Sequence, residues 1–342
     1  MVRVGLAGLG FMGGTHAQCH AAIPSSKLVA VCDVEADRRN KFAETYGATP
    51  CASLDEMLKA DIDMVDFCLP TYLHKEAVEA AAKARKHILC EKPMALNAAE
   101  CDAMSAAVKK AGVEFMAGHV IRFWPEYVVI KEILDSGKLG KIKWMSATRM
   151  SPPPTWSWRE WLFDPKLSGG AVLDLHIHDL DFIAWILGKP NTISAAGVKT
   201  KTGALDAVFT TMTGTPSGAV GFAEGSLELM AGFPFTMGLK INLEGGSIEF
   251  NSRLSPSLLI AHPDGSVTNP HVPQPEVPTV AGAGSGGNIS ALGGYFIEVD
   301  YFVNCIDKGE KPTTVTADEA KFAVELCLAA TKSAETGKPV AL

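Results

Sequence analysis

The chain has 342 residues with a formal net charge of −7 at neutral pH, and 47% of its residues are hydrophobic. This length can supply two domains with cores of their own, while the acidic balance argues against nucleic acid or a membrane surface as a partner. No uninterrupted apolar run is long enough to cross a bilayer. The first residues enter a strand pattern without the layout of a signal peptide, and the eight cysteines form no CxxC pair. These features predict a cytoplasmic protein with reduced thiols.

Residues 1 to about 120 alternate short apolar, strand-like runs with helical runs. The expected strands are 2–7, 28–33, 64–69, 87–90 and 114–117, and the expected helices are 12–23, 36–46, 73–84 and 98–111. This alternation predicts an α/β domain in which a doubly wound parallel sheet is covered by helices on both faces.

The pattern changes after Gly118. The next expected elements are a helix over 125–136, a strand over 142–150, a Pro- and Trp-rich loop over 151–158 and a helix that runs to about Leu187, with Gly188 as its cap. Successive strands with short turns then predict an antiparallel sheet, over 208–213, 219–227, 235–243 and 247–250. A long loop rich in Pro and Gly follows over 262–288, and helices over 291–307 and 317–336 close the chain.

The strongest motif of the first domain is a glycine-rich turn. Gly8, Gly10 and Gly13 fit the pattern G-x-G-x-x-G, which follows a strand directly and opens a helix that begins near Phe11 and Met12. The glycines allow a tight turn and a close approach of the backbone to a pyrophosphate, and the start of the helix offers free N–H groups. We therefore expect a dinucleotide at this turn.

An acidic residue follows at the spacing that a dinucleotide site needs. Asp33 stands twenty residues after Gly13, at the end of the second strand, where a carboxylate accepts hydrogen bonds from the adenosine ribose. The same carboxylate would repel a 2′-phosphate, so NAD is favoured as the cofactor. Arg38 and Arg39 keep NADP as an alternative, because an arginine could reach such a phosphate.

Two further segments follow strands of the same sheet. Glu91 and Lys92 come directly after the strand at 87–90, and a lysine there can stabilise negative charge on a substrate oxygen. Pro70 and Thr71, at the end of the preceding strand, are expected beside the nicotinamide ribose. His74 is open to two interpretations, one at the cofactor and one purely structural.

The second domain contains an acid and a base at helical spacing. Asp174 and His178 are four residues apart, so both side chains are expected on one helix face. An imidazole ordinarily titrates near pH 6.5 and can take a hydroxyl proton, while the carboxylate orients it or holds a neighbouring hydroxyl. His176 points to a different side of the helix, and no CxxC or HExxH pattern is present. No catalytic metal is expected.

Four other residues are candidates for substrate contact. Trp156 and Trp158 precede the helix and could stack on a sugar ring, although aromatic residues here could equally pack between the domains. His119 and Arg122 lie where the chain passes between the domains. Arg122 could pair with an anionic substrate group or brace this junction.

Together these motifs resemble the glucose–fructose oxidoreductase / inositol dehydrogenase (Gfo/Idh/MocA) family over nearly the whole chain. The matching pieces, in order, are Gly8–Gly13, Asp33, Thr71–His74, Glu91-Lys92-Pro93, Gly118 with Arg122-Phe123, Gly169-Gly170 with Asp174 and His178, and the closing segment from Ala317 to Val340.

The resemblance implies a Rossmann domain over 1–120 that binds NAD(P). It also implies a C-terminal α+β domain with a large open, mostly antiparallel sheet over 121–315, and a last helix over 316–342 that returns near the first domain. In this family the lysine of the Glu-Lys-Pro segment and the Asp and His of the helix do the chemistry, which implies roles for Lys92, Asp174 and His178. The exposed sheet face implies a homodimer or homotetramer.

The expected reaction transfers a hydride between nicotinamide and a secondary hydroxyl of a cyclic polyol, sugar or sugar derivative. One alternative is an enzyme that holds NAD tightly and oxidises a sugar transiently for elimination or epimerisation. A second alternative is a non-catalytic nucleotide sensor, against which the intact set of Lys92, Asp174 and His178 argues, since a sensor needs no proton acceptor facing the nicotinamide.

Overall fold

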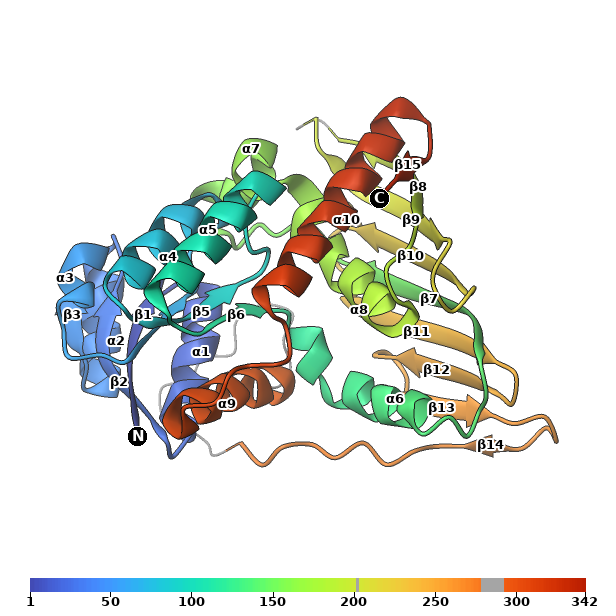
Figure 1. The fold of residues 1–342 in the computed structure, drawn as a ribbon, viewed down its shortest axis with the longest axis horizontal. Coiled ribbons are helices and arrows are strands. Elements are labelled where there is room, and N and C mark those ends of the chain that lie inside the picture. The colour runs from blue at the N-terminus through green and yellow to red at the C-terminus, as the bar shows by residue number, and fades with distance from the viewer. Residues whose placement is uncertain (201–202, 278–291) are drawn as a thin grey trace. The chain divides into compact units, whose positions relative to one another are not determined.

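The computed structural model of the chain describes residues 1–200, 203–277 and 292–342. It divides into two units, each built on one sheet (Figure 1). Unit 1 comprises Met1–Phe123 with Gln274–Lys321, and unit 2 comprises Trp124–Pro273 with Phe322–Leu342. No helix in the described part of the chain has the length and apolar character that a membrane span requires.

Unit 1 is built on a six-stranded, wholly parallel sheet in the order β3-β2-β1-β4-β5-β6. Its strands are β1 (Val2–Ala7), β2 (Ser26–Cys32), β3 (Thr49–Cys51), β4 (Met64–Phe67), β5 (His87–Glu91) and β6 (Phe115–Gly118). The central strands are almost entirely apolar because helices cover both faces of the sheet. The expected doubly wound parallel sheet is confirmed.

Four helices of unit 1 follow the expected alternation, α1 (Phe11–Ala22), α2 (Ala36–Tyr46), α4 (His74–Lys83) and α5 (Ala98–Ala111). The unit also contains α3 (Leu54–Leu58), which was not expected, α9 (Gly293–Lys308), and the short helical turns η1 (Thr71–Leu73) and η2 (Val120–Phe123). In Figure 1, α4 and α5 lie on one side of the sheet, and α1 and α9 lie on the other.

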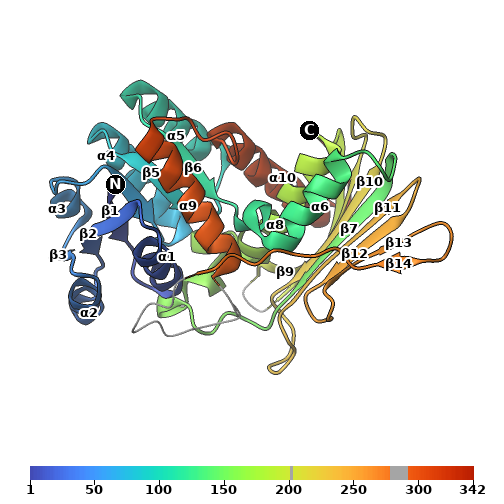
Figure 2. The ribbon, with the colours of Figure 1, turned by 90° about the horizontal axis from the view of Figure 1, so that it is seen from below.

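Helix α9 belongs to unit 1 although it is distant in sequence from the other elements. It packs against α1 (Figure 2). The ring of Tyr301 lies 5.4 Å from that of Phe123, and the amino group of Met1 is 2.6 Å from Asp307 Oδ1. The resemblance implies a second domain over 121–315, whereas Gln274–Lys321 belong to unit 1. The structure differs because the buried face of α9 packs against α1 of the Rossmann unit.

Unit 2 is built on a nine-stranded sheet in the order β14-β13-β12-β11-β7-β10-β9-β8-β15. The strands are β7 (Ile142–Met150), β8 (Thr192–Lys199), β9 (Leu205–Thr213), β10 (Val220–Ser226), β11 (Thr236–Leu243), β12 (Ser247–Asn251), β13 (Leu258–Ala261), β14 (Val267–Thr268) and β15 (Val340–Ala341). Every neighbouring pair is antiparallel except β10 with β7. The expected large, mostly antiparallel sheet is confirmed. Strand β14 lies within the expected 262–288 loop, of which residues 278–288 are outside the described residues.

The remaining helices are α6 (Pro125–Asp135), α7 (Pro165–Ser168), α8 (Ile177–Leu187) and α10 (Ala317–Thr336), with a short helical turn η3 (Trp158–Phe163). The segment directly before α8 is a π-helix, η4 (Val172–His176), and this departs from the regular α-helix that the sequence predicts. Two glycines in left-handed backbone geometry, Gly169 and Gly170, precede it. Side chains at these two positions would be strained, so the glycines are required where the chain enters this helical segment.

A buried ion pair and two glycines of β10 fix α8 on one face of the sheet. The Arg149 guanidinium of β7 donates to both carboxylate oxygens of Asp179, with Nε–Oδ2 at 2.9 Å and Nη2–Oδ1 at 3.0 Å. A Cβ added at Gly221 would lie 2.5 Å from Ile183 Cγ2, and one added at Gly225 would lie 2.9 Å from His176 Nδ1. The two glycines therefore leave the space that the helical side chains fill.

Replacing Arg149 by Met tests this attachment. The change leaves the Asp179 carboxylate buried without its partner, which is expected to lower the free energy of unfolding by about 3–5 kcal/mol. Chemical denaturation at pH 7 measures the loss. The control is Lys240→Met, which breaks the exposed Lys240–Glu249 pair of the same sheet and should cost at most about 1 kcal/mol. Equal losses in the two variants would contradict the assignment.

Candidate functional site

The glycine turn after β1 has the geometry of a dinucleotide cradle. Gly8 has a φ of +86°, and a Cβ added there would lie 2.4 Å from the carbonyl oxygen of Cys68. A Cβ added at Gly13 would lie 1.9 Å from the carbonyl oxygen of Gly8. At Gly10, by contrast, an added Cβ would meet nothing within 4 Å. Gly8 and Gly13 are therefore needed by the protein itself, whereas the open space at Gly10 is where a pyrophosphate can approach the backbone.

The first turn of α1 carries no acidic residue, and its N-cap residue, Gly10, has no side chain that could accept a hydrogen bond from the N–H groups of this turn. The N–H groups at this end of the helix can therefore meet an anionic ligand. Phe11 and Met12, the first residues of the helix, are half-buried. The residues present fit a dinucleotide, since both the space and the donors for a pyrophosphate are in place.

Asp33 is tied to the glycine turn. Its Oδ2 accepts a 2.7 Å hydrogen bond from the backbone N–H of Leu9, and its Oδ1 accepts one of 2.8 Å from Glu35. Nη1 of Arg38 lies 3.4 Å from Oδ2, and Arg39 donates to the Asp33 carbonyl at 2.7 Å. The carboxylate is thereby held beside the turn, where it can accept hydrogen bonds from ribose hydroxyls.

Lys92 leaves the carboxyl end of β5 and is half-buried. Its backbone N–H donates to Oε2 of Glu91 at 3.0 Å. Parallel strands end at one edge of the sheet, so Lys92 lies at the same edge as the glycine turn that follows β1. Pro70 and the buried Thr71 follow β4, the strand between them.

His74 is fully buried and engaged within the protein on both sides of its ring. Nδ1 lies 2.9 Å from the carbonyl oxygen of Pro93, and Nε2 lies 2.8 Å from that of Leu69. Burial lowers the pKa of His74. These contacts tie the segment after β4 to the segment after β5, which supports the structural interpretation of this histidine.

In unit 2, Asp174 and His178 lie on the helical segment formed by η4 and α8. Asp174 is half-buried in the π-helix and His178 is 8% exposed one turn later in α8. A π-helix closes i→i+5 hydrogen bonds, so its turn is wider than the α-helical turn that the sequence analysis assumed. Single-turn π segments occur frequently at functional sites.

His176 turns toward the sheet. Its Nε2 lies 2.9 Å from Oγ1 of Thr210 on β9, and burial together with the charge of Arg149 lowers its pKa to about 3. A neutral imidazole held between strands is a packing residue. The side of the helical segment that faces the sheet is therefore the side that carries His176.

The four candidates for substrate contact have different surroundings. His119 is fully buried, and Arg122 is 5% exposed with its Nη1 donating to Glu319 Oε1 at 2.6 Å. Burial raises the pKa of Glu319, but Arg122 and hydrogen bonds from Thr316 outweigh it and lower that pKa overall. Arg122 thus braces unit 1. Trp156 is 52% exposed, and the ring of Trp158 is covered by the Arg159 guanidinium at 4.5 Å.

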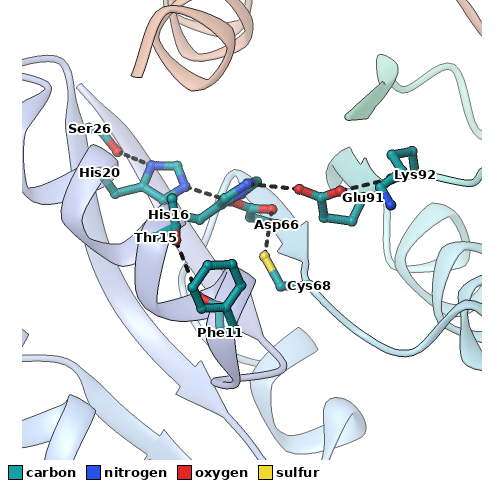
Figure 3. A network of polar contacts seen from close by, with 9 residues as sticks. All are labelled: Phe11, Thr15, His16, His20, Ser26, Asp66, Cys68, Glu91 and Lys92. Atoms are coloured by element: carbon teal, nitrogen blue, oxygen red, sulfur yellow. Dashed lines mark hydrogen bonds and ion pairs between the residues drawn. The ribbon is translucent and has the colours of Figure 1, made fainter. Parts of the chain in front are cut away.

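A buried polar network that was not expected from the sequence lies below the sheet edge of unit 1 (Figure 3). It joins His16 and His20 of α1, Asp66 of β4 and Glu91 of β5. Two signals could have revealed it. The histidines are four residues apart on α1, and Asp66 is the one charged residue in an otherwise apolar strand, MVDF.

The geometry defines the class of this protein as a Rossmann-fold dinucleotide-binding protein with a second, sheet-based unit. Comparison with known proteins refines this class. A model described as an oxidoreductase family with an NAD-binding Rossmann fold matches residues 2–119, and the GFO/IDH/MocA C-terminal domain matches residues 127–249. The chain belongs to the Gfo/Idh/MocA family of oxidoreductases, and its first unit is an NAD-binding Rossmann domain.

Relatives of known name support this assignment. The scyllo-inositol 2-dehydrogenase (NAD(+)) of Bacillus subtilis is 30% identical over 361 residues, which cover 100% of this chain and 96% of that protein. The myo-inositol 2-dehydrogenase of Thermotoga maritima is 36% identical over 191 residues, which cover 55% of each chain. The solved structure of a levoglucosan dehydrogenase in complex with NADH and levoglucosan has the same fold, with a TM-score of 0.85 and 24% identity over 100% of this chain and 99% of that one.

Two glycine substitutions separate cofactor binding from folding. Gly10→Ala places a methyl group in open space, so we expect the unfolding temperature to change by no more than about 3 °C. The methyl group occupies the path of the pyrophosphate, so the dissociation constant for NADH, measured by fluorescence titration, should rise at least about tenfold.

The matched variant is Gly13→Ala, in which the methyl group collides with the Gly8 carbonyl. It should lower the unfolding temperature clearly, whether or not NADH is added. An unchanged NADH affinity in Gly10→Ala would rule out this position as the approach of the pyrophosphate.

Proposed function

We propose that the protein transfers a hydride between NAD(H) and a secondary hydroxyl of a cyclic polyol, sugar or sugar derivative. The main observation in support of this proposal is that three features lie at one edge of the parallel sheet. The glycine turn follows β1, Asp33 follows β2 and Lys92 follows β5. The named inositol dehydrogenases among the relatives support the substrate class. Asp33 favours NAD over NADP, because its carboxylate would repel a 2′-phosphate.

Each proposed catalytic residue has one task. His178 accepts the proton of the substrate hydroxyl, since an imidazole exchanges protons readily near neutral pH. Asp174 orients this imidazole or holds a neighbouring hydroxyl. The ammonium group of Lys92 stabilises the negative charge that develops on the substrate oxygen. Bound NAD supplies the hydride acceptor, and the protein aligns the partners.

Substitution of each of these residues is expected to lower kcat/KM. His178→Ala should lower kcat/KM by about 10²–10⁴-fold and Lys92→Ala by about 10²–10³-fold, with Asp174→Asn lowering it as well. NADH affinity should change less than about threefold in His178→Ala and Asp174→Asn. The measurement is NADH formation in a screen of inositols, aldoses and sugar acids with both NAD and NADP.

Lys75→Ala is the control, because this lysine pairs with Glu79 one turn further along α4, and the change should leave turnover unchanged. Near-normal turnover in all three test variants would refute the assignment. Bound NAD that survives purification, with no net formation of NADH, would instead favour transient oxidation.

We also propose that the chain forms a homodimer or homotetramer through the outer face of the nine-stranded sheet. Trp144, Phe209, Val220 and Phe222 are each about two-fifths exposed, and alternating residues of the same strands are buried. Val220 stands opposite Trp144 across the β10–β7 pair. A row of apolar side chains on adjacent strands is typical of a surface that a second copy covers.

Phe222→Lys should weaken self-association at least about 30-fold, because it puts a charge in the centre of this row. Light scattering across a dilution series measures the change. Met230→Lys, at a position 84% exposed outside the strands, is the control. A wild-type protein that is monomeric at every concentration would disprove the proposal.

We further propose that the protein resides in the cytoplasm. The eight cysteines, all in the described part of the chain, form no disulfide, and seven of them are buried. Burial raises the pKa of Cys32 to about 11 and that of Cys19 to about 12. Protonated, buried thiols are inert core residues of the kind found in a reducing compartment.

A further inference from the structure

A continuous path of polar contacts runs through the interior of unit 1 and ends at the amide of Lys92 (Figure 3). Nδ1 of His20 lies 2.8 Å from Oγ of Ser26, and its Nε2 lies 2.9 Å from Oδ2 of Asp66. The same Asp66 oxygen lies 2.8 Å from Nδ1 of His16. On its other side, Nε2 of His16 is 3.1 Å from Oε1 of Glu91.

The contacts of His16 favour the charged form of its ring. Its Nδ1 must carry a proton to donate to Asp66, and its Nε2 faces a second carboxylate at ion-pair distance. An imidazole between two carboxylates is stable only when both nitrogens carry protons. Burial lowers the pKa of His16, but the charge of Asp66 outweighs it and raises that pKa well above its ordinary value. The contact with Asp66 and the raised pKa both favour the imidazolium form of His16 at neutral pH.

The groups packed around His16 are consistent with one positive charge on its ring. From α1 they are Cys19 and His20, from β4 and its end Asp66 and Cys68, from β5 Glu91, and from α9 Tyr295 and Glu298. Glu298 is fully buried, and neither of its carboxylate oxygens has a hydrogen-bond partner among the described residues. Burial and the charge of Glu91 raise the pKa of Glu298, which disfavours a third negative charge at this point.

Glu91 connects His16 to Lys92, the first residue after β5. Its Oε1 faces His16, and its Oε2 accepts the backbone N–H of Lys92 at 3.0 Å. A Cβ added at Gly118 on the neighbouring strand β6 would lie 3.3 Å from both Cδ and Oε2 of Glu91. The carboxylate thus has Oε1 at ion-pair distance from His16 and Oε2 in a hydrogen bond, and Gly118 leaves the space beside it free of a side chain.

We infer that His16 is a positioning residue that fixes the Glu91 carboxylate and, through it, the direction in which Lys92 leaves the sheet. His20, one turn further along α1, contacts Asp66, and the described residues include no contact between His20 and Glu91. It therefore anchors Asp66 without affecting the direction in which Lys92 leaves the sheet. The inference rests on the proposed role of Lys92 in catalysis. The experiments below distinguish a failure of the inference about His16 from a failure of that role.

The matched pair of variants is His16→Gln and His20→Gln. Each removes one imidazole from the same Asp66 oxygen, so similar losses of unfolding temperature are expected. His16→Gln should lower kcat at least about tenfold, with KM for the substrate and the dissociation constant for NADH changed less than about threefold. His20→Gln should leave kcat within about twofold of the wild type. Equal losses of kcat in both variants would mean that His16 is only structural and would overturn the inference.

A double-mutant cycle tests whether His16 acts through Glu91. If it does, the double variant His16→Gln/Glu91→Gln should lose about as much kcat as the more impaired single variant, because both changes break one path. Independent losses that multiply to about a hundredfold would overturn the inference. The substrate is the polyol or sugar with the highest turnover in the screen. Full activity of Lys92→Ala alongside a non-additive cycle would refute the role of Lys92 and leave the coupling of His16 to Glu91 intact.

The charge of His16 can be measured without a substrate. Nitrogen-15 NMR of the histidine rings in the full chain should show both nitrogens of His16 protonated at pH 7 and above, with the signal assigned by its absence in His16→Gln. A neutral ring at pH 7 would overturn the inference. So would a transition ion bound at about one per chain and lost in the variant, since ligand-type atoms of His16, Asp66 and Cys68 lie within 4.8 Å of one another.

Discussion

The parallel pairing of the six-stranded sheet is the constraint on which the chemistry of unit 1 depends. Because all six strands run in one direction, the segments that follow β1, β2, β4 and β5 leave at one edge. The glycine turn, Asp33, Cys68 and Lys92 stand in these four segments. They span more than eighty residues of sequence, and it is the order of the strands that assembles them. The exchange of order between β1 and β4 creates the crevice in which such sheets bind dinucleotides.

Buried charges fix the helices on both sheets. In unit 1, two histidines one turn apart on α1 meet a single oxygen of Asp66, so rotation of the helix about its axis would break one contact or the other. In unit 2, the two-pronged contact of Arg149 with Asp179 does the same for α8. A buried pair of this kind adds little net stability, but the cost of separating it is large. The helices that carry the site residues are therefore held in one orientation, while apolar packing supplies most of the stability.

Periodicity and glycine spacing were enough to predict much of this fold. The bounds of α2, α5 and α10 agree with the expected ranges, and left-handed glycines cap the first two, at Gly47 and Gly112. The roles of Gly8, Gly10 and Gly13 also follow from their spacing. The π segment at Val172–His176 was not predicted from periodicity, and its residue His176 packs over Gly225 of a strand that is distant in sequence. The partners of Asp66 were missed for the same reason, since they exist only after α1 has packed on the sheet.

Glutamate is suited to position 91 for a physical reason. Its two oxygens have two different partners, the imidazolium of His16 and the following backbone N–H. A glutamine would turn its own NH₂ group toward one of these donors, and an aspartate would be one carbon too short to reach both. The Glu91 carboxylate also lies close to Gly118, where an added Cβ would be in tight contact with it at 3.3 Å. The constraint on the Glu-Lys-Pro segment therefore extends beyond the segment itself, to a helix seventy-five residues earlier and to a strand twenty-seven residues later. A lysine in a loop is ordinarily mobile. In this protein the backbone N–H of Lys92 donates to Glu91, and Glu91 in turn contacts His16 of α1.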